Sequence, residues 1–256
     1  MYFYIYDTFV NEKKFEPVLD KLENRLIELG INGRIEKLTV LKNMKTLIED
    51  GIDKGAHTVV AVGDDTTLIK TINFVANHED IMIGFIPIKE NTVFGKIMGL
   101  NDITEACNVL SKRLAKVIDL GRASKNYFLG SIQIPNAAGV KIECDGEYKV
   151  STNNQRASLS IKNLGDLFSG DFKEYNARDG LLDIVIAPPA LSGFKKMVGR
   201  EKAEGETIFQ AKKLRITSKN GSVPVILDEE TTLKTPVDIE IKPKKIKLIV
   251  GRERVI

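Results

Sequence analysis

Residue types that mark several common classes of functional site are scarce in this 256-residue chain. It contains two cysteines, two histidines and no tryptophan. Cys107 and Cys144 lack the spacing of zinc or redox motifs, and His57 and His78 are too isolated to suggest a nucleophile and its base. The C-x-x-C, Walker A and G-x-S-x-G patterns are also absent. These absences argue against disulfide, zinc, P-loop and serine-hydrolase chemistry, and they favour a cytoplasmic location.

An excess of one charge and long apolar runs are missing too. With 38 basic and 35 acidic residues the net charge is only +3, so we predict no nucleic-acid partner. No apolar run approaches the roughly 18 to 20 residues that span a bilayer. Basic residues gather at Lys242–Lys247 and Gly199–Lys202, where they form either a solvated face or a contact with anionic lipid headgroups. Any membrane contact is therefore expected to be peripheral.

What the sequence does contain is a hydrophobic pattern that changes along the chain. Up to residue 118, buried strands such as Thr58–Val62 alternate with helical stripes such as 103–114, which predicts a doubly wound, mostly parallel sheet. From 119 onwards, short runs of period two dominate, including Tyr127–Ile134, Val237–Ile241 and Ile246–Val250. They predict an antiparallel β-sandwich. We therefore expect an α/β domain at 1–118 and a β-rich domain at 119–256.

The segment Val59–Leu68, VVAVGDDTTL, predicts a buried strand that ends in a polar turn where a helix begins. Such a turn presents backbone N–H groups and hydroxyls where the helix dipole favours an anion. A carboxylate there repels bare phosphate, so Asp64 fits a phosphate site only if it holds a metal or a hydroxyl. The plain alternative is that Asp and Thr cap the helix. The candidate nucleotide-binding residues in the turn are Gly63, Asp64, Asp65, Thr66 and Thr67.

Three later segments carry further polar residues in a suggestive order. Gly84–Ile88 ends in Ile-Pro-Ile and leads into KENTVFGKIMGL; Tyr175–Ile186 reads YNARDGLLDIVI; Val225–Glu230 reads VILDEE. Taken alone, NARDG is typical of a hairpin turn and DEE of an acidic hairpin tip. Adjacent carboxylates that are partly buried raise one another's pKa, which suits a general base. A second acidic candidate is the literal DGE at Asp145–Glu147.

In this order the segments resemble the catalytic domain of the diacylglycerol kinase family, which includes sphingosine kinases and bacterial lipid kinases and is distantly similar to NAD kinases. The family pattern is GGDGT, then a strand ending in Ile-Pro followed by GTGNDFA. Gly63, Asp64 and Thr66 match the first motif, whereas Val62 and Asp65 replace its glycines. Pro87, Phe94 and Gly99 match the second motif and its continuation, whereas residues 89–93 replace the GTGND core. Asp7 and Thr8 replace the family's asparagine-proline. The resemblance covers nearly the whole chain.

The resemblance implies a role for each matching residue. Asn176, Asp179 and Leu181 would hold a structural Mg²⁺ through an amide oxygen, a carboxylate and a backbone carbonyl. Glu230, assisted by Asp228, would deprotonate a lipid hydroxyl for attack on the γ-phosphoryl group of ATP. Lys89 does not match the pattern; our hypothesis is that its ammonium binds phosphate and partly compensates for the glycines lost from the turn.

The function implied is therefore an ATP- and Mg²⁺-dependent lipid kinase acting on a diacylglycerol-like alcohol. One alternative is a catalytically inactive, kinase-like protein that binds lipid or nucleotide, which the replaced glycines favour. A second is an NAD kinase-like enzyme, which shares the first domain but not the DG-x-LD and DEE features. Contact with an anionic membrane and a homodimer are left open.

Overall fold

The chain forms two compact units in a computed structural model that describes residues 1–39, 42–152, 157–164, 176–188, 206–252 and 254. The first unit is Met1–Ile118 together with Lys244–Ile256, and the second is Asp119–Pro243. The structure thus places residues 244–256, which the sequence pattern grouped with the second domain, in the first unit. The reason is that Lys247 and Leu248 near the end of β16 (Val237–Ile249) pair in parallel with β4.

The sheet of the first unit is parallel throughout. Its strand order is β2-β1-β3-β4, followed by the end of β16. The strands are β1 (Tyr2–Tyr6), β2 (Arg34–Lys37), β3 (Thr58–Gly63) and β4 (Met82–Pro87). Every residue of β1 and β3 is buried, as expected for parallel strands with helices on both faces.

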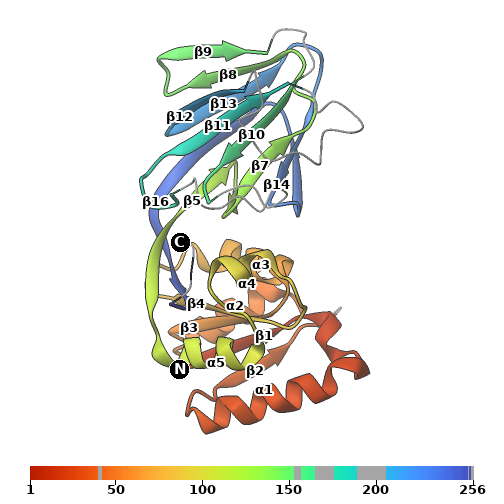
Figure 1. Cartoon of the computed structure of the whole chain (residues 1–256), viewed down its shortest axis with the longest axis vertical. Coiled ribbons are helices and arrows are strands. Elements are labelled where there is room, and N and C mark those ends of the chain that lie inside the picture. Colours follow the sequence, from red (N-terminus) through yellow and green to blue (C-terminus); the bar gives the residue numbers. More distant parts are fainter. Residues whose placement is uncertain (40–41, 153–156, 165–175, 189–205, 253, 255–256) are drawn as a thin grey trace, which may run out of the picture. The chain divides into compact units, whose positions relative to one another are not determined.

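Helices cover both faces of this sheet. In Figure 1, α1 and α5 lie on one side of the strands and α2 and α3 on the other, and contacts join α1 to α5 and α2 to α3. The bounds are α1 (Glu16–Glu28), α2 (Met44–Asp53), α3 (Asp65–Val75), α4 (Val93–Ile97) and α5 (Ile103–Lys112), with 3₁₀ turns at Thr8–Asn11 and Lys13–Phe15. The prediction of a doubly wound α/β unit is confirmed. Among the described residues, no helix has the length and apolarity needed to cross a membrane.

The second unit consists of two antiparallel layers. One contains β6 (Asn126–Phe128), β8 (Val140–Cys144), β9 (Tyr148–Ser151) and β13 (Lys213–Ser218), with the parts of β5 (Ala115–Ala123) and β16 that belong to this unit. The other has the order β12-β11-β10-β7-β14-β15. Its strands are β12 (Thr207–Ala211), β11 (Leu182–Ala187), β10 (Ser158–Lys162), β7 (Ser131–Ile134), β14 (Pro224–Leu227) and β15 (Thr231–Lys234).

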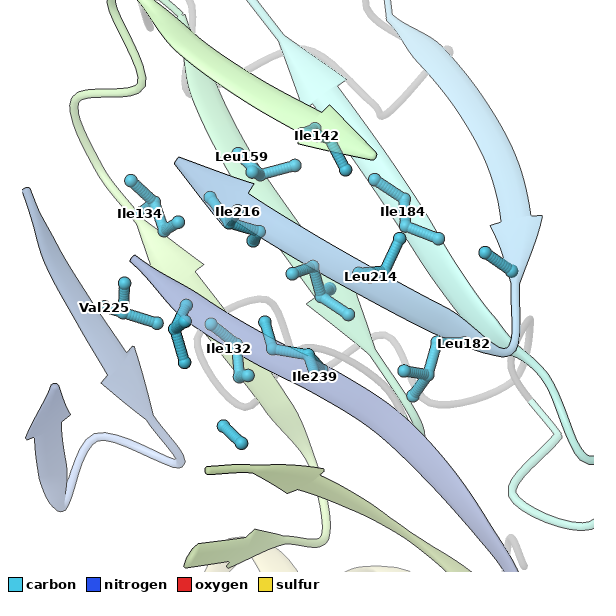
Figure 2. Packing of buried hydrophobic residues seen from close by; sticks show 14 of the residues in the cluster. Ile132, Ile134, Ile142, Leu159, Leu182, Ile184, Leu214, Ile216, Val225 and Ile239 are labelled. Atoms are coloured by element: carbon cyan, nitrogen blue, oxygen red, sulfur yellow. The ribbon is translucent and has the colours of Figure 1, made fainter. Parts of the chain in front are cut away.

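Apolar side chains from both layers interdigitate to form the core of this unit (Figure 2). Ile132 and Ile184 come from one layer and Ile216 and Ile239 from the other. The predicted β-sandwich is confirmed, but two of its strand bounds were wrong. Residues 237–249 form one strand. Pro243 does not interrupt it, because the pairing with β13 ends at Glu240 and the pairing with β4 involves Lys247 and Leu248, so neither needs an N–H group at Pro243. The predicted strand Tyr127–Ile134 is in fact two, β6 and β7.

Candidate functional site

The GDDTT turn lies at the carboxyl end of β3, between β1 and β4. Asp64 is the N-cap of α3 and forms a capping box: the Thr67 N–H donates to Asp64 Oδ1 at 3.2 Å, and the Asp64 N–H donates to Thr67 Oγ1 at 3.1 Å. A Cβ on Gly63 would lie 2.2 Å from that hydroxyl, so only glycine fits there. Thr66 is half-buried in the first turn of the helix. Helix capping, the plain alternative, therefore accounts for part of this turn.

Two more side chains converge on the same turn. The Thr67 hydroxyl donates to Asp7 Oδ2 at 2.7 Å, and the Lys89 Nζ lies 2.6 Å from Asp64 Oδ2 and 4.3 Å from the centre of the Phe9 ring. Burial works to raise the pKa of Asp64, but the bonds from Lys89 and Thr67 outweigh it, and the net pKa is lowered. The bond to Asp64 in turn raises the pKa of Lys89. Lys89 thus acts here as the counter-ion of Asp64.

Phe9 and the contact made by Asp7 were not predicted as site features. The position of Asp7 in the sequence could have indicated its contact. It follows directly after β1, and the carboxyl ends of parallel strands meet at one edge of a sheet.

Asp65, the residue that most departs from the resembled pattern, contacts the second departing segment. Its Oδ2 accepts the Val93 N–H at 2.7 Å and its Oδ1 accepts the Phe94 N–H at 3.0 Å. Val93 is the first residue of α4, so the carboxylate occupies the first N–H groups of that helix. Two of the departures from the family pattern, Asp65 and the segment 89–93, are therefore joined by a hydrogen bond.

The DEE segment forms the tip of the hairpin between β14 and β15, with Asp228 and Glu229 at positive φ. The Asp228 carboxylate is 3% exposed and accepts N–H groups from all three residues of 129–131, at 2.7, 2.9 and 2.8 Å. Burial raises its pKa to about 6, although these three bonds oppose the rise, and Glu229 adds a smaller upward contribution. Glu229 and Glu230 are exposed. Of the predicted pair, only Glu230 reaches solvent.

The literal DGE at 145–147 forms another hairpin tip, between β8 and β9. Asp145 Oδ1 accepts the N–H groups of Lys212 and Lys213 at 3.1 and 2.7 Å. The side chain of Asp145 therefore links this hairpin turn by hydrogen bonds to the turn that leads into β13.

The predicted magnesium-binding residues form a turn that leads into β11. Asn176 and Asp179 are exposed and Leu181 is half-buried; Tyr175, at the start of the motif, lies outside the described residues. Asp179 Oδ1 accepts the Leu181 N–H at 2.9 Å. Carboxylate, amide and carbonyl oxygens are hard donors that suit Mg²⁺. In the described part of the chain no three His, Cys, Asp or Glu side chains gather as metal ligands, so an ion here would depend on Asp179 with neutral oxygens.

A buried polar framework, which the sequence did not reveal, connects this turn to the DEE hairpin. Asp119 Oδ2 accepts the Gly180 N–H at 2.9 Å, and Asn163 Nδ2 donates to the carbonyls of Asp119 and Leu129, each at 2.9 Å. The Leu129 N–H then donates to Asp228. Asp119 and Asn163 are 2% and 1% exposed and lie in no recognisable motif. The two predicted sites of the second unit therefore share one set of hydrogen bonds.

A parallel α/β unit with the GDDTT turn after β3, continued by a β-sandwich, defines the fold of this chain. The whole chain shares it with solved structures from Bacillus anthracis str. Sterne: one named a candidate diacylglycerol kinase has a TM-score of 0.80 at 19% identity, covering 98% of this chain and 96% of that one. Another, named a diacylglycerol kinase, has a TM-score of 0.79 at 19% identity, covering 98% and 97%. At this identity the likeness establishes the fold. No family model and no curated protein matches the sequence.

Proposed function

We propose that this chain is an ATP- and Mg²⁺-dependent kinase that transfers the γ-phosphoryl group to the hydroxyl of a diacylglycerol-like lipid. The observation that carries the proposal is the place of the GDDTT turn, at the carboxyl end of a central parallel strand, where α/β proteins bind phosphate-containing ligands. The fold, shared over 98% of the chain with structures named for this activity, supports it.

The proposed chemistry is an in-line displacement. The lipid oxygen forms a bond to the γ-phosphorus, the bond between that phosphorus and the β,γ-bridging oxygen breaks, and ADP leaves. Glu230, exposed at the hairpin tip, takes the proton of the lipid hydroxyl. Asp228 holds the hairpin in shape. Gly63, Asp64, Thr66 and Thr67 would face the nucleotide, and Asn176, Asp179 and Leu181 would hold Mg²⁺ in a structural role.

A lipid substrate requires contact with a membrane surface. We propose that this contact is peripheral and involves the basic cluster Lys242–Lys247 within β16. Lys244 is exposed there, whereas Lys242 pairs with Glu240 at 2.8 Å. The other basic cluster, Gly199–Lys202, lies outside the described residues.

Glu230→Gln tests the proposal, with Glu229→Gln as a matched control from the same exposed turn. Transfer of radiolabelled phosphate from ATP to diacylglycerol in anionic vesicles should fall by about 100-fold or more in Glu230→Gln, the usual cost of losing a general base. Glu229→Gln should keep most of the activity, and both variants should have the melting temperature of the wild type. Undiminished transfer by Glu230→Gln would remove the base assignment.

One observation favours a second candidate, a kinase-like binding protein without transferase activity. Asp65 and Lys89 place side chains where the resembled motifs have glycines, and Lys89 pairs with Asp64. A thermal-shift titration with magnesium-ATP separates the two candidates, because a ligand at 100 times its Kd stabilises the folded state by about 2.7 kcal/mol. No shift at millimolar nucleotide, together with no transfer to lipid, would reject the kinase in favour of the binding protein.

A further inference from the structure

We infer that Asp65 is a positioning residue: its carboxylate holds residues 88–94 so that the Lys89 ammonium faces the GDDTT turn. An anionic ligand at this corner then meets the Lys89 side chain instead of backbone N–H groups at the start of α4. The inference deepens the proposed function and rests on it only for the identity of that ligand.

Three consecutive residues of the turn each hold part of the facing segment. The Gly63 carbonyl accepts the Ile88 N–H at 2.8 Å, and Asp64 pairs with Lys89 at 2.6 Å. Asp65 accepts the N–H groups that begin α4, at 2.7 and 3.0 Å. Hydrogen bonds thus hold the segment at Ile88 and again at Val93 and Phe94, and Lys89 lies between these two points.

The chain between these attachments has little freedom to move Lys89 elsewhere. Asn91 has a φ of 61°, a left-handed conformation, and Thr92 is buried. A Cβ on Gly95 would approach the Thr92 hydroxyl to 2.3 Å, so α4 packs closely on the segment. Removing Asp65 would release the segment at Val93 and Phe94 and leave the Ile88 bond and the Lys89–Asp64 pair at its other end.

The Asp65 bonds also decide which donors a ligand can use. Hydrogen bonds from backbone N–H groups to a carboxylate are charge-assisted and stronger than neutral ones. An incoming phosphate would have to displace a covalently tethered anion to reach Val93 and Phe94. Lys89, by contrast, has a half-exposed side chain and can exchange Asp64 for a phosphate oxygen without unfolding any backbone.

A double-mutant cycle between Asp65→Ala and Lys89→Ala tests this coupling, with calorimetric binding of magnesium-ATP as the readout. We expect Lys89→Ala to weaken binding about tenfold in the wild type and less than twofold in the Asp65→Ala background. Asp102→Ala is the matched control, because Asp102 also caps a helix, α5, through the Glu105 N–H at 2.8 Å. In that background Lys89→Ala should keep its full effect. If Lys89→Ala lowers the affinity for magnesium-ATP equally in all three backgrounds, the inference is overturned.

A second measurement needs no nucleotide and therefore separates failure of this inference from failure of the kinase proposal. NMR titration of the Lys89 ammonium should show a pKa above the ordinary lysine value in the wild type, since the bond to Asp64 and the negative charges of Asp64, Asp7 and Glu12 raise it. Asp65→Ala should bring that pKa down, and Asp65→Asn should retain more of it, because Asn keeps one acceptor for the α4 N–H groups.

Both substitutions remove the same charge, so the difference between Ala and Asn isolates the hydrogen bonds from simple electrostatics. An identical Lys89 pKa in the two variants, or one unchanged from the wild type, would refute the positioning role whether or not the protein binds ATP. Amide exchange of Val93 and Phe94 should also accelerate at least tenfold in Asp65→Ala.

Discussion

At the scale of single residues, burial decides what an aspartate in a hairpin turn does. Asp145 and Asp228 both lie at positive φ, 51° and 44°, and both accept backbone N–H groups from a distant segment. Asp145 is exposed, whereas Asp228 is 3% exposed. If the aspartate is removed, water can replace its carboxylate as hydrogen-bond acceptor only at the exposed site. The two side chains should therefore differ in their effect on stability.

Asp228→Ala should lower the free energy of unfolding by about 2 to 4 kcal/mol, because buried N–H groups at 129–131 lose their acceptor. Asp145→Ala should cost about 1 kcal/mol or less. Urea unfolding of both variants beside the wild type measures the difference. Equal losses of unfolding free energy would show that burial does not make the Asp228 hydrogen bonds more important for stability than those of Asp145.

The raised pKa of Asp228 also predicts a dependence of stability on pH. Its pKa is about 6 in the folded protein and about 3.9 in an unfolded chain. Between these values the folded state binds more protons at Asp228, so the contribution of this residue to stability falls as pH rises from about 4 to 6, by about 3 kcal/mol in total. Asp228→Asn, although less stable throughout, should lack this fall. Parallel curves for the two proteins between pH 4 and 7 would contradict the assignment.

At the scale of elements, the start of α3 combines helix capping with the candidate nucleotide turn. One hydroxyl, Thr67 Oγ1, accepts the Asp64 N–H and donates to Asp7, which links the ends of β1 and β3 to the first turn of the helix. Geometry that begins a helix therefore also fixes the carboxylates of the site. A change here should alter stability and nucleotide binding together.

Thr67→Val keeps the side-chain shape but removes the hydroxyl. We expect a loss of about 1 to 2 kcal/mol, the usual cost of a lost N-terminal cap, and weaker binding of magnesium-ATP. Thr232→Val, on the exposed face of the edge strand β15, should change stability by less than about 0.5 kcal/mol. Urea unfolding and calorimetry give both quantities. Wild-type stability in Thr67→Val would mean that the capping box contributes little.

At the scale of the whole molecule, β16 contributes to the cores of both units. Ile239 is 1% exposed and belongs to the sandwich core, whereas Leu248 is fully buried where β16 pairs with β4. One strand thus supplies equivalent apolar side chains to two separate cores. Substitutions only nine positions apart should therefore destabilise different units.

Leu248→Ala and Ile239→Ala should each cost about 2 to 5 kcal/mol, as large-to-small changes in a core do. Hydrogen exchange should show lost protection in β3 and β4 for the first variant and in β8 and β13 for the second. The location of the loss is the test, because the total cost is similar. Lost protection in the same strands for both variants would contradict the division into two units.

Local patterns predicted most of the elements because the helices and parallel strands here follow simple periodicity. The alternation up to residue 118 identified β3 and α5 within a few residues. The pattern failed at β5, β12 and β15, where short or partly exposed strands carry weak alternation. It also divided β16 in two, because Pro243 signals a break when its pairing partners are unknown.

The sequence by itself determined the two-unit α/β and β-sandwich architecture and the positions of its polar turns, because periodicity and turn chemistry are local properties of the chain. Only the tertiary structure decided what the side chains in those turns contact. Asp65 bonds to residues 28 and 29 positions away, and Asp228 bonds across 97 to 99 positions. The same acidic residues that look alike in sequence thus become a helix cap, a buried anchor or an exposed candidate base, because folding gives each of them different neighbours and different access to water.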